Sequence, residues 1–534
     1  MASLKQPIIS RQPKLEVLED RLPLSTFTVV NDLSQGPGSL NQAVLDANNN
    51  PGPDKIGFNI PGEGPFHLNP GLKFGNDLIV DGFSQPGASP NMLSVGSNAV
   101  MKIAVNYSYD TGDKCEIRGL IISGSMVLGS DCIFQGNYFG VDFDGLHAVP
   151  SSYLSCVSNC LIGGSEPKDR NFISYLVLHY DNNLIYGNYF GLSSNGLDPV
   201  IRGTNWPSQN AIDVDSANNS IGGPLPGQGN VISGYTSGTA ICFVGFSSQI
   251  AHSDNNIIQG NYIGTNGFGT ADEGSSPFLE RSERVHALAN GAAFTFNLGR
   301  NNLIGGLTAG CRNIISNNGA AVYIYSGGCD GNKFQGNYIG CDINQQPLGN
   351  QTGVYIFGGA KNNIIGGPEE GAGNIIAYNS AYGIQIDGDQ SNGNLIDPNK
   401  FHGNRGIGID LGANGRTANG VPGRPGPNGN QNYPVISKAK YQVVKGVKYV
   451  VITGSLHGIK NTVHRLEFFS NATTRAVDAQ GQFFLGFAYV KTNATGKSNF
   501  SLRFKFQPGR FITSTATDWV LKNTSEFSPA VLRT

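Results

Sequence analysis

The sequence is poor in charge: Asp, Glu, Lys and Arg make up 14% of its 534 residues, against about 25% in an ordinary soluble domain. It contains no run of about 18 apolar residues, which excludes a membrane-spanning helix. Its eight cysteines form no Cys-x-x-Cys pair and have no accompanying histidine cluster, so we do not expect a structural zinc site. Helical patterns of ten or more residues are missing from the central region, which argues against alternating strands and helices.

Glycine is abundant, with 74 residues, and asparagine is common. Both residues tolerate a positive φ, so this composition is typical of a chain that turns tightly and often. Hydrophobic residues at 39% and aromatic residues at 10% argue against disorder. We expect the cysteines to be buried thiols. If the protein is exported, one or two disulfides such as Cys329–Cys341 are the alternative.

Three short phrases repeat along the chain. Gly-Asn-Tyr-(Phe/Ile)-Gly occurs at 136–140, 187–191, 260–264 and 336–340, and Ile-Gly-Gly starts at residues 162, 221, 304 and 365. The third phrase, Asn-x-Ile-(Ser/Ala), always begins nine residues after the Ile of Ile-Gly-Gly, at Asn171, Asn230, Asn313 and Asn374. A fixed gap within a variable larger spacing indicates one structural unit that has been copied, with loops of different length between copies.

Between about residues 100 and 412 the apolar residues alternate in short segments separated by Gly and Asn, which predicts strands of three to five residues. The spacing between equivalent glycines is 30 residues from Gly353 to Gly383 and 23 from Gly383 to Gly406. A coil of three short strands and three turns needs about this length. Stacked coils would let Asn side chains form hydrogen bonds from one coil to the next. We assign one such ladder to Asn137, Asn188, Asn261 and Asn337. Further ladders are assigned to the Asn pairs at 182–183, 218–219, 301–302 and 362–363. The tyrosines of the first phrase should stack similarly.

The two ends of the chain differ from the repeats. Residues 1–25 have basic residues without an apolar core, and we expect a sorting or processing segment rather than a conventional signal peptide. Leu40, Ala43, Val44 and Ala47 share one face of a predicted short helix that follows Ser39 as N-cap and would cover the first coil. Residues 413–431 consist largely of Gly, Pro and Asn and are predicted to be a linker.

Residues 432–534 show five or more short strand patterns and are predicted to form a β-sandwich. They carry 14 Lys and Arg against 4 Asp and Glu, a net charge of +10, whereas residues 1–431 carry 22 against 34, a net charge of −12. The basic segment is therefore expected to attract an anion, which could be an acidic polysaccharide, a lipid surface or the acidic segment beside it. Two unrelated solvated faces are the simpler alternative.

The combined Asn-Asn-x-Ile-Gly-Gly, Asn-x-Ile-Ser and Gly-Asn-Tyr-Ile-Gly phrases resemble bacterial right-handed parallel β-helix repeat proteins of the pectin-lyase-like fold. The C-terminal segment resembles the Ig-like module that often follows such helices, and residues 15–22 resemble an N-terminal signature of exported bacterial proteins. The resemblance implies an all-β fold, with a right-handed parallel β-helix over 26–412 and an Ig-like β-sandwich over 432–534. It also implies an extracellular or cell-envelope location.

The resemblance supplies no catalytic residue. Asp-Asp, Asn-Thr-Asp, Gly-His-Gly and Arg-Ile-Lys, which mark the polygalacturonases, are absent, and so are the Asp-His and Arg-x-Pro-x-x-Arg signatures of pectate lyases. The local sequence suggests one cluster instead: if Gly383 lies over Gly406, Asp387 lies over Asp410. The candidate catalytic residues are then Asp387, Asp410, Arg405 and His402, and the candidate metal ligands, for Ca²⁺ if any, are Asp387, Asp389 and Asp410. Asp residues that cap turns are the alternative, as they are for Asp142 and Asp144, which resemble half of a calcium loop.

Two loops interrupt the repeats and could build a binding face. Residues 192–210 contain Trp206, and residues 271–290 are dense in charge. An exposed Trp can stack on a sugar ring, so the candidate substrate-binding residues are Trp206, Arg281, Arg284 and His286. A loop folded on itself, with Trp206 against the helix, is the alternative.

We therefore expect an exported or envelope β-helix protein that binds a carbohydrate or another surface component, with no required cofactor. One alternative is a divergent polysaccharide lyase or glycoside hydrolase that acts in the β-helix groove. Another is a structural spacer or adhesin stalk. We expect a monomer. We also expect no binding of nucleic acid, because the repeat region is acidic.

Overall fold

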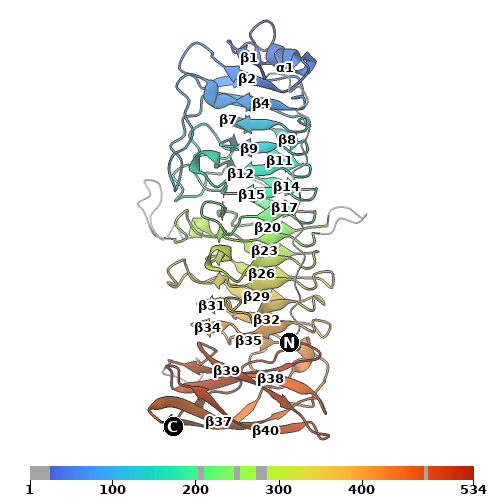
Figure 1. The fold of residues 1–534 in the computed structure, drawn as a ribbon, viewed down its shortest axis with the longest axis vertical. Coiled ribbons are helices and arrows are strands. Elements are labelled where there is room, and N and C mark those ends of the chain that lie inside the picture. The colour runs from blue at the N-terminus through green and yellow to red at the C-terminus, as the bar shows by residue number, and fades with distance from the viewer. Residues whose placement is uncertain (1–23, 151, 203–209, 246–252, 272–285, 474–478) are drawn as a thin grey trace, which may run out of the picture.

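The computed structural model describes residues 24–150, 152–202, 210–245, 253–271, 286–473 and 479–534. The described chain forms a long stack of coils followed by two antiparallel sheets at its C-terminal end (Figure 1). The predicted sorting segment 1–25 lies outside the described residues except for its last two. The coils form three parallel sheets, which we call sheets A, B and C, so the predicted all-β parallel β-helix is confirmed.

From β6 onward each coil contributes one short strand to each sheet, whereas the first coils contribute none to sheet C. Sheet A has 13 strands, which are β1 (Ser25–Val29), β2 (Asp54–Phe58), β4 (Leu78–Asp81), β6 (Glu116–Arg118), β9 (Ile133–Gln135), β12 (Leu161–Gly163), β15 (Leu184–Tyr186), β18 (Ser220–Ile221), β21 (Ile257–Ile258), β24 (Leu303–Gly305), β27 (Lys333–Gln335), β30 (Ile364–Gly366) and β33 (Leu395–Asp397).

Sheet B has 12 strands, which are β3 (Phe66–Leu68), β5 (Ile103–Asn106), β7 (Leu120–Ser123), β10 (Tyr138–Phe139), β13 (Phe172–Ile173), β16 (Tyr189–Phe190), β19 (Val231–Ile232), β22 (Tyr262–Ile263), β25 (Ile314–Ile315), β28 (Tyr338–Ile339), β31 (Ile375–Ala377) and β34 (Lys400–His402). Sheet C has 10 strands, which are β8 (Ser125–Leu128), β11 (Tyr153–Cys156), β14 (Leu176–Leu178), β17 (Ile212–Val214), β20 (Thr239–Phe243), β23 (Ala292–Phe296), β26 (Ala320–Ile324), β29 (Thr352–Ile356), β32 (Ile384–Ile386) and β35 (Ile409–Leu411).

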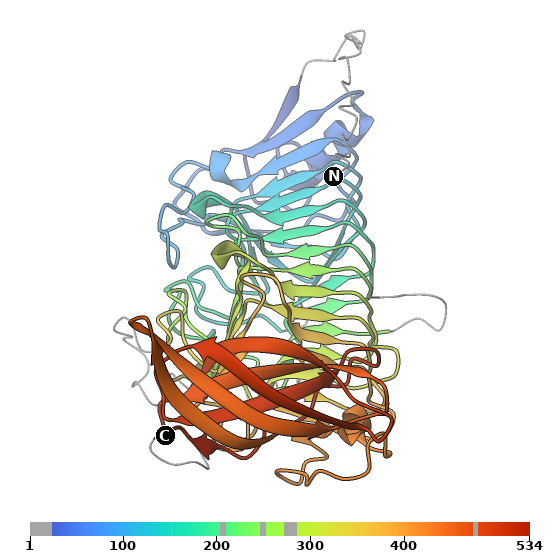
Figure 2. The same ribbon diagram turned by 60° about the horizontal axis from the view of Figure 1, so that its bottom comes forward.

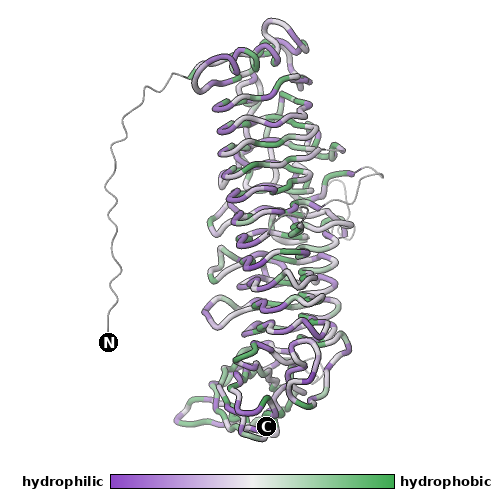
Figure 3. The backbone as a smooth tube through the Cα atoms, turned by 90° about the vertical axis from the view of Figure 1, so that its right-hand side faces the viewer, coloured by the Kyte–Doolittle hydropathy of each residue, from purple (hydrophilic) through white to green (hydrophobic). Residues whose placement is uncertain are grey.

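A single apolar core fills the space enclosed by the three sheets. Equivalent inward residues lie directly above one another, as Val322, Val354 and Ile384 do in sheet C, and all three are fully buried. Figure 3 shows these coils stacked along the length of the rod. Because the core is continuous, each coil buries its apolar face against the next one, and the outward side chains are free for other roles.

Three ladders of buried asparagines connect the coils at the corners. The first runs through Asn137, Asn171, Asn188, Asn230, Asn261, Asn313, Asn337, Asn374 and Asn399. The second runs from Asn183 to Asn428 and the third from Asn290 to Asn404. The predicted ladders are confirmed, with two differences. The Asn residues of the first and third phrases alternate within one ladder, so one sequence repeat spans two coils. Of each predicted Asn pair only the second residue joins the second ladder, and the first adopts a positive φ.

The tyrosines of the first phrase lie on the outer face of sheet B, but they do not stack directly on one another. Tyr138 pairs with Phe172, and Phe172 pairs with Tyr189. Ring centroids are 5.0 Å apart in the first pair and 5.4 Å apart in the second. The prediction of a continuous tyrosine stack was wrong because the tyrosines belong to alternate coils.

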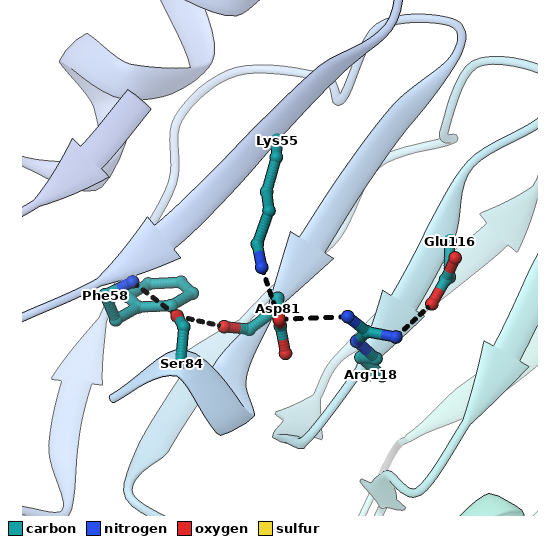
Figure 4. Close-up of polar contacts among 6 residues, drawn as sticks. All are labelled: Lys55, Phe58, Asp81, Ser84, Glu116 and Arg118. Atoms are coloured by element: carbon teal, nitrogen blue, oxygen red, sulfur yellow. Dashed lines mark hydrogen bonds and ion pairs between the residues drawn. The ribbon is translucent and has the colours of Figure 1, made fainter. Parts of the chain in front are cut away.

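Helix α1 (Leu40–Asn49) covers the first coil, as Figure 1 shows near β1. Ser39 accepts a hydrogen bond from the backbone N–H of Gln42, and the four predicted apolar residues of the helix are all buried. The first coils are also joined on sheet A by ion pairs (Figure 4). Asp81 lies 2.8 Å from Lys55 and 3.0 Å from Arg118, so one carboxylate connects three neighbouring strands.

The C-terminal residues form a β-sandwich. Its outer layer, sheet D, contains β36 (Val435–Val444), β37 (Val447–His457) and β40 (Lys497–Lys505), and its inner layer, sheet E, contains β39 (Phe483–Lys491), β38 (Val463–Asn471), β41 (Phe511–Asp518) and β42 (Val531–Leu532). Their shared core includes Val450 and Ile452 of sheet D and Leu466 and Phe468 of sheet E.

The sandwich is docked directly on the last coils of the β-helix. Glu526 accepts hydrogen bonds from the backbone of Leu411 at 2.8 Å and from that of Thr417. Phe527 packs on Phe401 of β34, with ring centroids 5.4 Å apart. Residues 413–431, predicted as a linker, contain a short 3-10 helix (Pro427–Asn430) and contribute Asn428 to the second ladder.

All eight cysteines are free thiols, and seven of them are buried. The alternative of a Cys329–Cys341 disulfide is therefore not realised. Among the described residues, none of the helices has the length and apolar character needed to span a bilayer.

Candidate functional site

The outer face of sheet C carries a row of aromatic and titratable side chains. The strand register places one outward residue of each coil in this row, which consists of Ser155, Val177, Asp213, Cys242, Thr295, Tyr323, Tyr355, Gln385 and Asp410. Side chains two positions later along the chain point to the same side, and they include His179, Asp215, Tyr325, Phe357 and Asp387. These residues form two clusters.

The first cluster is built around Asp213 in β17, which is only 3% exposed. Its carboxylate accepts hydrogen bonds from the Tyr175 hydroxyl and from the Asn210 side-chain amide, both at 2.7 Å. Burial raises the pKa of Asp213, and the neighbouring carboxylate of Asp215 acts in the same direction. Asp213 therefore holds a proton to a higher pH than an ordinary aspartate does.

His179 connects two further groups of this cluster. Its Nε2 atom lies 2.9 Å from the hydroxyl of Tyr153, and its Nδ1 atom lies 3.7 Å from Oδ2 of Asp215. The His179 side chain is 38% exposed, whereas that of Asp215 is 6% exposed. A phenol, an imidazole and a carboxylate thus lie next to one another, with the imidazole the most exposed of the three. Groups of this kind can exchange protons with a ligand.

The second cluster lies four coils further along sheet C and is mainly aromatic. Tyr355 stacks on Phe357 with centroids 4.3 Å apart, and Tyr325 lies 5.2 Å from Phe357. Tyr325 is 52% exposed. The Tyr355 hydroxyl donates a hydrogen bond of 2.7 Å to Asp387, and burial together with this carboxylate raises the pKa of Tyr355 to about 12.

The two clusters lie on one rigid, extended surface, because neighbouring strands of a sheet are about 4.8 Å apart. Tyrosine rings offer flat apolar faces with a polar edge, and carboxylates and imidazole offer hydrogen-bond partners. This combination suits a long ligand with many hydroxyl groups.

The strand register does not place Asp387 over Asp410, contrary to the expectation from the sequence. Asp410 pairs with Gln385, not with Asp387, so the expected stacking of the two carboxylates was wrong. The offset between these coils is 25 residues, because Ile384 pairs with Ile409, so that Gly383 is equivalent to Gly408 and not to Gly406. Asp410 is fully buried and accepts hydrogen bonds from the backbone N–H groups of Asn414 and Gly415. It caps a turn, which is the alternative noted from the sequence.

His402 and Arg405 lie elsewhere, in and after β34 of sheet B. They line a cavity of about 600 Å³ at the junction with the sandwich. The sandwich contributes Asn471, Ala472, Thr473 and Gln482 to the lining of this cavity. The four candidate catalytic residues therefore occupy two separate surfaces.

The predicted metal ligands do not gather either: Asp389 is exposed, and Asp387 is engaged by Tyr355. Within the described ranges, the group whose ligand atoms lie close enough to hold a metal is Asp142, Asp144 and His147. Asp142 accepts backbone hydrogen bonds at 2.9 Å from Leu146 and at 3.0 Å from His147, which is turn capping.

Three of the predicted substrate-binding residues, Trp206, Arg281 and Arg284, lie outside the described residues. The fourth, His286, is described and has an exposed side chain.

Asp213, Asp215, Tyr175 and His179 were missed from the sequence. Ile212-Asp213-Val214-Asp215 carries two acidic residues at alternate positions of a strand, so both face outward. Placing each strand between its two ladder asparagines would have shown that these carboxylates and His179 share one face.

The chain matches no model of a known protein family, and a search of curated proteins finds no match either.

Proposed function

We propose that this protein binds an extended carbohydrate along the outer face of sheet C, at the cell envelope or outside the cell. The carrying observation is the pair of clusters on that face, in which the exposed ring of Tyr325 and partly buried aromatic rings lie on the same face as carboxylates and an imidazole. The resemblance of the repeats to pectin-lyase-like proteins supports the same substrate class. Such a ligand would stack on Tyr325 and Phe357 and extend toward His179, bonding through its hydroxyl groups.

The test is binding to a glycan array and to soluble polysaccharides. Replacing Tyr325 and Phe357 together by Ala should weaken binding at least about tenfold, which corresponds to about 1.4 kcal/mol. Phe143→Ala is the matched control, since Phe143 is 58% exposed and lies in the connection that follows β10 of sheet B. Failure to bind any glycan or envelope fraction would exclude the proposal and favour the structural spacer.

A second candidate function is polysaccharide cleavage. It is favoured because Asp213, whose pKa is raised, could donate a proton, while the neighbouring group of Tyr153, His179 and Asp215 could accept one. In a lyase step, Tyr153 with His179 would remove the proton from the carbon next to a uronate carboxylate. The glycosidic oxygen one carbon further would leave with the bonding electrons, and Asp213 would protonate it. The products are a carbon–carbon double bond in one fragment and a new hydroxyl group in the other.

Incubation with uronate polymers tests this second function, because the unsaturated product absorbs in the ultraviolet. His179→Ala and Asp213→Asn should each remove the signal, while Phe143→Ala should leave it unchanged. A reducing-end assay on the same samples separates hydrolysis from elimination. If neither product forms while a polymer binds to sheet C, the protein is a binding protein.

A further inference from the structure

Sheet D, the outer layer of the sandwich, is strongly basic. It lies at the far end of the rod from α1, and Figure 2 shows its long strands in the foreground. Its three strands contain no Asp or Glu and six basic residues, which are Lys438, Lys440, Lys448, Lys497, Arg503 and Lys505.

Five of these cations share the outward face of sheet D. Lys440 and Arg503 both pair with Val451 of the central strand, from opposite sides. Lys505 pairs with Tyr449, and Lys497 with His457. The alternate residues, such as Val450 and Ile452, point into the sandwich core. Lys438, Lys440, Lys497, Arg503 and Lys505 are all exposed.

These five cations are not neutralised within the protein. None of them forms an ion pair with any residue in the described part of the chain. The junction with the β-helix uses a different cation, that of Arg465, together with the carboxyl group of Glu526 and contacts between neutral groups such as the one between Gln480 and Asn404. The five cations on the outer face of sheet D therefore form none of the ion pairs that attach the sandwich to the acidic β-helix in the described part of the chain.

Sheet E lies between this face and the β-helix. Packed sheets are about 10 Å apart, which is similar to the Debye length at about 0.1 M salt. Sheet E and this separation weaken the effect of the acidic coils on the outer face of sheet D, so that this face can attract an anion.

We propose that the outer face of sheet D is a second binding site, specific for an acidic polysaccharide. Arg503 stacks on Tyr449, with its guanidinium carbon 4.9 Å from the ring centroid, which presents its N–H groups to a carboxylate. The positions between the cations carry hydroxyl and amide groups, from Thr453, Ser501 and Asn499, that can bond to sugar hydroxyls. A flat face with several separated cations fits a polymer that carries repeated negative charge.

Binding to polygalacturonate tests the proposal, with the full chain and with neutral dextran for comparison. A variant with Lys440→Glu, Arg503→Glu and Lys505→Glu should bind polygalacturonate at least about tenfold more weakly. Binding by the unaltered protein should weaken as salt is added. The control variant, Lys333→Glu, Lys361→Glu and Lys400→Glu, makes the same change in net charge at exposed positions of the β-helix and should bind within about twofold of the unaltered protein.

Three outcomes would overturn the proposal: no binding to polygalacturonate at low salt, an equal loss in the control variant, or tighter binding to phosphatidylglycerol vesicles, which would assign the face to a membrane. The Tyr325→Ala/Phe357→Ala variant separates this site from the one proposed on sheet C. It should bind polygalacturonate normally through sheet D even if the carbohydrate proposal for sheet C fails. Circular dichroism confirms that each variant is folded.

Discussion

Arg465 of β38 and Asp397 of β33 form an ion pair across the junction between the sandwich and the β-helix, with Nη2 and Oδ1 2.8 Å apart. The two side chains are only 3% and 1% exposed. Glu467 lies 2.9 Å from the same guanidinium group, and burial together with Asp397 raises its pKa. One buried cation thus faces two carboxyl groups, and the junction is organised around it.

Removing that cation should weaken the junction. Arg465→Met leaves Asp397 buried without its cation, and breaking such a pair typically costs about 3 kcal/mol or more. We expect the sandwich to unfold at a lower urea concentration and to become susceptible to proteolysis. Lys460→Met, at an exposed site of the same sandwich, is the control. Identical transitions for both variants would show that the ion pair does not hold the sandwich in place.

The junction should also lose stability as the pH rises. Burial raises the pKa of Glu526 from 4.5 to about 7, and the neighbouring Asp410 contributes. Because the folded state binds this proton more tightly, its stabilising effect is complete below about pH 4.5 and is lost as the pH approaches 7. The loss amounts to at most about 3 kcal/mol. Urea unfolding between pH 4.5 and 8 measures it, and Glu526→Gln should flatten this part of the profile. The slope would persist in the variant if Asp410 or Glu467 were the cause.

The asparagine ladder should be costly to interrupt. Asn230 is fully buried, and its Oδ1 accepts a hydrogen bond of 2.9 Å from the backbone N–H of Asn188. Its side-chain amide donates to the carbonyl of Ile185. Asn230→Ala leaves both partners unsatisfied, and we expect a loss of about 2–4 kcal/mol in urea unfolding. Asn344→Ala, at an exposed position, should change stability by less than about 0.5 kcal/mol.

The ion pairs around Asp81 should stabilise the first coils mainly above acid pH. Burial alone would raise the pKa of Asp81, but hydrogen bonds and charge from Arg118 and Lys55 lower it below 3.8. The stabilisation is therefore present above pH 3.8 and is lost as the pH falls through the lower, folded pKa. Asp81→Asn should cost about 1–2 kcal/mol at pH 7, reduced by the partial exposure of both cations.

Hydrogen exchange of the backbone in β2, β4 and β6 reports this change locally. Asp77→Asn is the control, because Asp77 is exposed and Asn also tolerates its φ of 54°. Equal exchange in the two variants at pH 7 would show that these ion pairs contribute nothing to the first coils.

The repeats allowed the coils and ladders to be predicted because their spacing follows from backbone geometry. Asn182, with φ of 67°, and Asn183, which is buried in the ladder, perform the same two tasks in every coil where the pair occurs. The outer face of sheet C could not be predicted in the same way. Whether Asp410 meets Asp387 or Gln385 depends on the length of each intervening turn, and these lengths vary between coils.

The alternation of the two asparagine phrases along the first ladder also sets the unit in which this protein can change length. Neighbouring coils are not interchangeable, because a Gly-Asn-Tyr coil lies next to an Asn-x-Ile-Ser coil throughout the first ladder up to Asn374. Duplication or deletion of a pair of coils preserves this alternation. Duplication or deletion of a single coil would instead place two coils of the same type next to each other. The distance between the α1 end and the basic face of sheet D can therefore change in steps of two coils, and each step is about 10 Å.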